Sequence, residues 1–122
     1  MLTGIDHVQV AAPPGCETAA RRFYGDLLGL AELEKPEALQ ARGGVWFACG
    51  DQQLHVGVER DFTPARKAHP AFQVRGYDAL RDGLIGAGLA VADDDAIPGV
   101  RRLYVDDPFS NRIELVALHS GA

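Results

Sequence analysis

Four side chains of metal-ligating type stand out in this sequence, namely His7, His55, His69 and Glu114. Each lies in a short run with the alternating or aliphatic-rich pattern of a β-strand. Glu114 stands between two large aliphatic residues, where an unpaired charge is costly to bury, so it needs a partner. Three imidazoles and one carboxylate at one point make a site for a divalent metal ion.

An internal repeat predicts that these side chains meet. His55 and Glu114 are 59 residues apart, as are the glycines that end the two predicted helices, Gly29 and Gly88. His7 and His69 are 62 residues apart, which requires only a three-residue contraction in the second copy. If the two copies pack about a pseudo-two-fold axis, we expect the four side chains to converge on one concave sheet surface.

The predicted elements occur in the same order twice. The first copy has a strand over 4–11, a helix over 17–28, a strand over 30–33, and strands over 44–49 and 53–59 that turn at Gly50-Asp51. The second has a strand over 69–74, a helix over 77–87, a strand over 89–92, an acidic loop over 93–95 and a hairpin over 100–116. We therefore expect an α+β fold of two βαβββ modules, related by a pseudo-two-fold axis, that form a cupped mixed sheet with helices outside. Residues 1–122 would form a single domain, with module 1 at about 1–59, a linker over 60–68 and module 2 at about 69–122.

Composition narrows the classes of function. A hydrophobic fraction of 47% without a long apolar run indicates a globular chain with no membrane partner. The N-terminus lacks a signal-peptide pattern, so a cytoplasmic location is expected. The formal charge of −5 argues against nucleic acid as a partner. Cys16 and Cys49 have no metal or redox spacing, and we expect both to be reduced.

Simpler interpretations compete with the metal site. A single histidine in a strand is more often hydrogen-bonded or at the surface than a ligand. Glu114 alone could form a salt bridge with Arg102 or Arg112. The metal site is favoured because three of the four histidines fall with Glu114 on positions that the repeat brings together.

Strand parity predicts the residues that line the cup. A final turn over 107–111 pairs Asp106 with Arg112, Tyr104 with Glu114, and Arg102 with Val116. Tyr104 and Arg102 would then face the cup and contact substrate, although Arg102 could equally be a solvated edge charge. The constant offset also places Val45 and Phe47 in the lining and Trp46 in the core, and a one-residue slip reverses this.

Several motifs resemble the vicinal oxygen chelate superfamily, which includes glyoxalase I, bleomycin-resistance proteins, fosfomycin-resistance enzymes and extradiol dioxygenases. The resemblance covers nearly the whole chain and rests on Asp6-His7-Val8, Phe23-Tyr24, Leu28-Gly29-Leu30, His69-Pro70-Ala71-Phe72 and the stretch from Asp107-Pro108 to Glu114-Leu115. It implies that His7, His69 and Glu114 are metal ligands, with a fourth ligand from the strand that holds His55.

Two positions depart from the family pattern. Ser110 replaces a usual glycine, and we expect Asn111 to take any left-handed conformation in the turn. His55 replaces a usual Glu or Gln. Only Glu114 is left to move a substrate proton, so lactoylglutathione lyase activity itself does not follow from the resemblance.

These observations predict an enzyme that depends on a divalent metal ion (Zn, Ni, Mn or Fe(II)). It would be a glyoxalase-like lyase, isomerase or dioxygenase, acting on a small substrate that chelates the metal through vicinal oxygens, with Glu114 as the catalytic carboxylate. The alternative is a non-catalytic protein that sequesters a drug or natural product, as bleomycin-resistance proteins do. Family members are usually paired, so we expect a homodimer, with the cup formed within one chain or by exchanged modules.

Overall fold

The computed structural model describes residues 1–118, which form two compact units divided between Pro64 and Ala65. Each unit is a four-stranded mixed sheet with one main helix, so the predicted α+β class is confirmed. The single domain with a linker over 60–68 stays a prediction. None of the helices described in residues 1–118 has the length and apolar character needed to cross a membrane.

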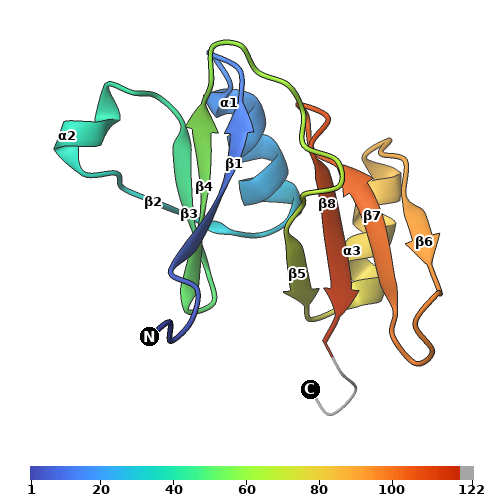
Figure 1. The fold of residues 1–122 in the computed structure, drawn as a ribbon. Helices are drawn as coiled ribbons and strands as arrows, with labels where there is room; N and C mark the ends of the chain where they lie inside the picture. Colours follow the sequence, from blue (N-terminus) through green and yellow to red (C-terminus); the bar gives the residue numbers. More distant parts are fainter. Residues whose placement is uncertain (119–122) are drawn as a thin grey trace. The chain divides into compact units, whose positions relative to one another are not determined.

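The sheet of the first unit has the strand order β1-β4-β3-β2. Its elements are β1 (His7–Ala12), α1 (Glu17–Ala20), η1 (Arg21–Leu27), β2 (Ala31–Leu33), α2 (Glu37–Gln40), β3 (Val45–Cys49) and β4 (Gln52–Val58). Strand β1 is parallel to β4, and the other pairs are antiparallel. In Figure 1, α1 and η1 lie behind β1 and β4, on one face of this sheet, and α2 lies at its side.

The predicted helix over 17–28 is confirmed, but most of it is wider than an α-helix. From Arg21 the segment η1 is a π-helix, with the Leu28 N–H donating to the Phe23 carbonyl five residues before it. The Leu30 N–H donates to the Tyr24 carbonyl and closes the C-terminal end of the segment. Phe23 and Tyr24, neighbours in sequence, are both buried and meet edge to face at 4.9 Å. The wide turn therefore lets two consecutive aromatic side chains enter the core.

The second unit repeats this arrangement with the strand order β5-β8-β7-β6. Its elements are β5 (Ala71–Val74), α3 (Tyr77–Gly86), β6 (Ala92–Asp94), β7 (Arg102–Asp106) and β8 (Arg112–Ala117). Strand β5 is parallel to β8, and α3 covers one face of the sheet (Figure 1). The predicted register of the last hairpin is confirmed: Asp106 pairs with Arg112, Tyr104 with Glu114, and Arg102 with Val116.

The repeat is visible in the registers of the two units. Gln9 of β1 pairs with His55 of β4, and Ala71 of β5 pairs with Glu114 of β8. These pairs keep the predicted offsets of 62 and 59 residues. His69, two residues before Ala71, precedes β5 rather than lying in it, which corrects the predicted strand start.

Other local predictions are wrong. The sequence pattern predicts a polar loop through 35–37, but Glu37 already begins the short helix α2. Asp93 and Asp94, expected in an acidic loop, belong to β6, because each carboxylate pairs with a guanidinium: Asp93 with Arg81 of α3 and Asp94 with Arg102 of β7. In the last turn Ser110, not Asn111, takes the left-handed conformation, with φ of 71°.

Candidate metal centre

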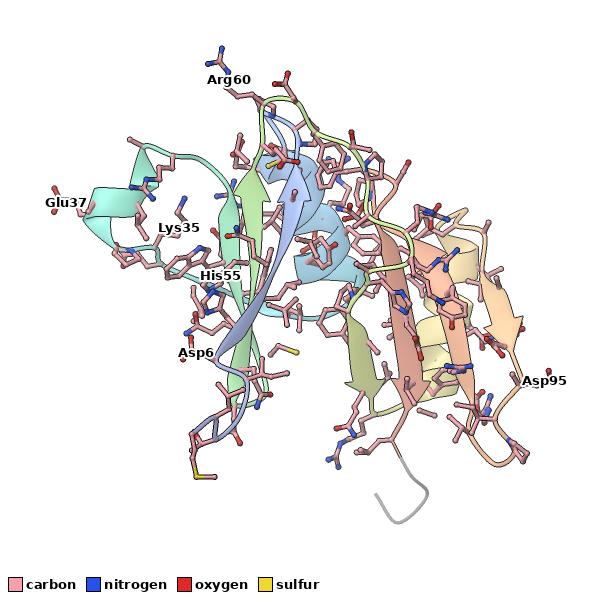
Figure 2. The ribbon with its side chains drawn as sticks, viewed as in Figure 1. Asp6, Lys35, Glu37, His55, Arg60 and Asp95 are labelled. Atoms are coloured by element: carbon pink, nitrogen blue, oxygen red, sulfur yellow. The ribbon has the colours of Figure 1, made fainter. Side chains whose placement is uncertain are left out.

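His7 and His55 meet on the face of the first sheet that the helix does not cover. Their rings stack with centroids 4.3 Å apart and planes 17° from parallel. The other face of the His55 ring stacks on the Trp46 indole, with centroids 3.8 Å apart and planes only 2° from parallel. Trp46 lies directly opposite His55 in the β3–β4 ladder. The three rings form a continuous stack, which we call the ring stack, and Figure 2 labels His55 at its centre.

The surroundings of His55 favour its neutral form. Burial lowers the pKa of His55 below its usual value, and the neighbouring His7 lowers it further. His55 Nε2 lies 2.8 Å from the side-chain oxygen of Gln53, which accepts the N–H of the neutral ring. Nδ1 of His55 then carries the lone pair that a metal ion requires.

His69 and Glu114 form the corresponding pair in the second unit. Nε2 of His69 lies 2.9 Å from Oε1 of Glu114, and both side chains are largely buried. Nδ1 of His69 donates to the backbone carbonyl of Lys67 at 2.9 Å. A backbone carbonyl on one ring nitrogen is the usual support for a histidine that binds metal through the other, so Nε2 is oriented toward the carboxylate.

Glu114 also makes the salt bridge that the simpler interpretation expects. Its Oε2 accepts from Nη1 of Arg102 at 3.2 Å, and Nη2 of Arg102 reaches Asp94 Oδ2 at 3.2 Å. Nε of Arg102 is buried without a hydrogen-bond partner among the described residues. Arg112, the other expected partner, instead lies over the Tyr104 ring, 5.3 Å from its centroid. Arg102 is therefore a partly buried partner of Glu114 rather than a solvated edge charge.

Tyr104 lies between these charged groups and a cavity of the second unit. It is opposite Glu114 in the β7–β8 ladder, and its ring meets the His69 ring edge to face at 5.6 Å. The cavity has a volume of about 530 Å³, and its lining includes Tyr104, Arg66 and Arg112. This position is compatible with the substrate-binding role predicted for Tyr104.

The role predicted for Phe47 is wrong. Phe47 is fully buried against Tyr24 of η1, and Val45 is buried on the same face. The reason is the length of the two hairpins: two residues join β3 to β4, whereas five join β7 to β8. Between ladder partners the difference is one residue, since Trp46 and His55 are nine residues apart and Tyr104 and Glu114 are ten apart, so Trp46 corresponds to Tyr104. Trp46 is the site residue that the constant offset missed, and the Gly50-Asp51 turn was the signal that could have found it.

The chemistry of the donor set fits a divalent metal ion. One ring nitrogen of each histidine is supported by an oxygen of a residue outside the predicted ligand set, from Asp6 for His7, Gln53 for His55 and Lys67 for His69, and the other nitrogen of His69 faces Glu114. Within residues 1–118, however, no group of three or more His, Cys, Asp or Glu side chains that could hold a metal ion is formed. Each unit brings two of the four predicted ligands together, and the four-ligand set stays a prediction.

Comparisons with known proteins identify the family. No protein-family model matches the chain, and no curated protein matches it. Among solved structures, a glyoxalase family protein from Bacillus anthracis is 56% identical, with a TM-score of 0.93 and 96% of each chain covered. Lactoylglutathione lyase from Agrobacterium tumefaciens is 19% identical, with a TM-score of 0.76 over 95% of this chain and 94% of the other.

The fosfomycin resistance protein FosX from Listeria monocytogenes has the same fold. A mutant of it, in complex with Mn(II) and 1S,2S-dihydroxypropylphosphonic acid, is 16% identical, with a TM-score of 0.78 over 99% of this chain and 96% of the other. The chain belongs to the glyoxalase family, within the vicinal oxygen chelate superfamily.

Proposed function

We propose that this protein is a divalent-metal-dependent, glyoxalase-like enzyme in which His7, His55, His69 and Glu114 hold the ion. The observation that carries the proposal is the His69–Glu114 pair, with 2.9 Å between Nε2 and Oε1 and the far ring nitrogen fixed on a backbone carbonyl. The substrate is a small molecule that chelates the ion through vicinal oxygens, and the reaction is a lyase, isomerase or dioxygenase reaction. Metal binding by FosX, a protein of the same fold, supports the proposal.

The ligand set suits an anionic oxygen chelate. A bound divalent ion supplies Lewis acidity that stabilises negative charge on the substrate oxygens. Three neutral imidazoles and one carboxylate leave the site with a net charge of about +1, which favours such a substrate. This mixed set does not select among Zn, Ni, Mn and Fe(II).

The protein's own groups would position the substrate and move its proton. Glu114 would be the carboxylate that accepts the proton, and its second oxygen lies 3.2 Å from Nη1 of Arg102. Tyr104 and the guanidinium of Arg102 would contact the substrate. With His rather than a carboxylate at position 55, we do not propose lactoylglutathione lyase activity.

One observation favours the alternative, a protein that sequesters a drug or natural product. The ring stack of His7, His55 and Trp46 offers an aromatic surface that a planar ligand could cover without any metal. Binding of such ligands by metal-free protein, without turnover of metal-loaded protein, would support this alternative.

The proposal is tested by measuring bound metal. The purified full-length protein is incubated with each of the four ions, freed of excess ion and subjected to elemental analysis. We expect about one ion per chain for the wild type and a loss of at least tenfold in affinity for His7→Ala, His55→Ala, His69→Ala and Glu114→Gln. Asp26→Asn, an exposed carboxylate on η1, is the control and should bind as the wild type does.

A wild-type protein that stays metal-free with every ion would overturn the proposal. Equal metal content in wild type and all four ligand variants would overturn the ligand assignment. Metal-loaded protein is then screened against 2-oxoaldehyde adducts, catechols and fosfomycin to identify the reaction.

A further inference from the structure

A small cavity of the first unit lies beside the ring stack and has no role in the proposed function. Its volume is about 250 Å³, and its lining includes Gln9 of β1, Trp46 of β3, Gly57 of β4, and Lys35, Leu39 and Arg42 from α2 and the segments beside it. We call it the Lys35 pocket. Figure 2 labels Lys35 near α2, with His55 close by in the view.

Two cations, Lys35 and Arg42, line the pocket. Within residues 1–118 neither Lys35 nor Arg42 forms an ion pair with a carboxylate, although the chain carries a formal charge of −5. The Lys35 ammonium donates to the Gly43 carbonyl, which anchors it while leaving two of its N–H groups for another acceptor. An anchored ammonium beside an exposed guanidinium, neither of them in an ion pair with the described residues, favours an anionic ligand.

The floor of the pocket supplies a further donor. Gln9 lies across Gly57, because a Cβ added at Gly57 would come within 2.7 Å of the Gln9 carboxamide carbon. The absence of a side chain at position 57 therefore gives the carboxamide its place on the floor. Its NH₂ group can donate to an oxyanion there.

The pocket adjoins one half of the proposed metal centre. Gln9 pairs with His55 in the β1–β4 ladder, and the Trp46 indole that lines the pocket stacks on the His55 ring. Its volume of about 250 Å³ is below the ~300–1,000 Å³ of complete ligand sites, so it suits one end of a small molecule.

We infer that the Lys35 pocket binds the oxyanionic end of the substrate, a carboxylate or a phosphonate, next to a planar or apolar segment that lies on the Trp46 indole. Lys35, Arg42 and Gln9 bind the oxygens, and the other end of the molecule lies toward His55. The inference extends the proposed function, since it names a property of the same substrate. The pocket itself contains none of the four proposed metal ligands.

The test uses the fluorescence of Trp46, the only tryptophan in the chain. Full-length protein, kept metal-free with a chelator, is titrated with benzoate, with phenylphosphonate and with neutral benzamide. We expect saturable fluorescence changes with at least one of the two anions and at least tenfold weaker binding of benzamide. The two anions distinguish a carboxylate site from a phosphonate site.

Matched variants assign the binding to the pocket. Lys35→Gln and Arg42→Gln should each weaken binding of the preferred anion about tenfold. Arg22→Gln removes the same charge from the exposed side of η1 and should bind as the wild type does. Circular dichroism of each variant establishes that it is folded.

Equal affinity for benzamide and the anions, or unchanged affinity in both pocket variants, would overturn the inference. Because the titration uses metal-free protein, it can succeed even if the chain never binds metal. The Lys35→Gln protein can likewise bind metal even if the Lys35 pocket binds no part of the substrate. The failure of the inference and the failure of the proposed function therefore give different results.

Discussion

Ser110 carries the turn between β7 and β8 in a conformation that its side chain disfavours. Its φ of 71° lies in the left-handed region. The surrounding bonds hold it there: the Ser110 N–H donates to the Asp107 carbonyl, and the Ser110 carbonyl accepts from Arg66 at 2.8 Å. Oδ1 of Asp107 accepts the N–H groups of Phe109 and Asn111, both at 2.9 Å.

We predict that Ser110→Gly stabilises the protein by about 0.5–1 kcal/mol, because glycine adopts this conformation without the Cβ penalty. The measurement is the midpoint of urea unfolding. Ser110→Ala is the matched control and should give no gain, since it keeps the Cβ. Equal gains from both substitutions would contradict the explanation.

For single residues, residue type predicted which proposed ligands lie together, but it did not predict the contacts that fix the backbone of the last turn. His7, His55, His69 and Glu114 follow from residue type and the repeat, and the structure pairs them two by two. The left-handed residue was assigned to Asn111 because asparagine tolerates that conformation. The Asn111 side chain instead donates to Asp107 within the turn and accepts the N–H of Ala65, 46 residues away, a contact that the sequence does not show.

Among the elements, β3 shows how a hairpin length decides which side chains reach the site. Phe47 pairs with Leu54 on the buried face, and Trp46 pairs with His55 on the other. The sequence predicted both strands and the turn between them. It did not predict the face, because nine residues separate the ladder partners Trp46 and His55 but ten separate Tyr104 and Glu114, and a one-residue shift reverses every side chain of a strand.

We predict that Phe47→Ala destabilises the protein by about 3–5 kcal/mol, since it leaves a cavity under η1. Trp46→Ala should cost less, about 1–2 kcal/mol, because that side chain is only partly buried. Urea unfolding followed by circular dichroism compares the two. A larger loss for Trp46→Ala would reverse the assignment of the two faces.

At the scale of the whole molecule, the proposed ligands are divided equally between the two units. Residues 1–64 hold His7 and His55, and the second unit holds His69 and Glu114. The repeat in the sequence predicted this division, because its offsets relate each ligand in the first copy to a ligand on the equivalent strand of the second copy. The repeat does not predict whether the two ligand pairs of a site come from one chain or from two, because that depends on how the chains associate.

In the expected homodimer, we predict that mixing two metal-binding variants shows whether each metal site forms within one chain or across two. One chain carries His7→Ala with His55→Ala, and a second, differently tagged chain carries His69→Ala with Glu114→Gln. If sites form across chains, the purified heterodimer regains one of its two metal ions. If they form within a chain, it regains none, and elemental analysis of the doubly tagged species distinguishes these outcomes.

In each unit the first strand pairs in parallel with the last, and we expect this to determine when the ligand pairs form during folding. Hairpins β3–β4 and β7–β8 join neighbouring segments, whereas the His69–Glu114 contact spans 45 residues and needs the first strand beside the last. Such distant pairings form late, because their loop-closure entropy must be met first. A metal ion bound to these residues would therefore slow unfolding far more than it would speed folding.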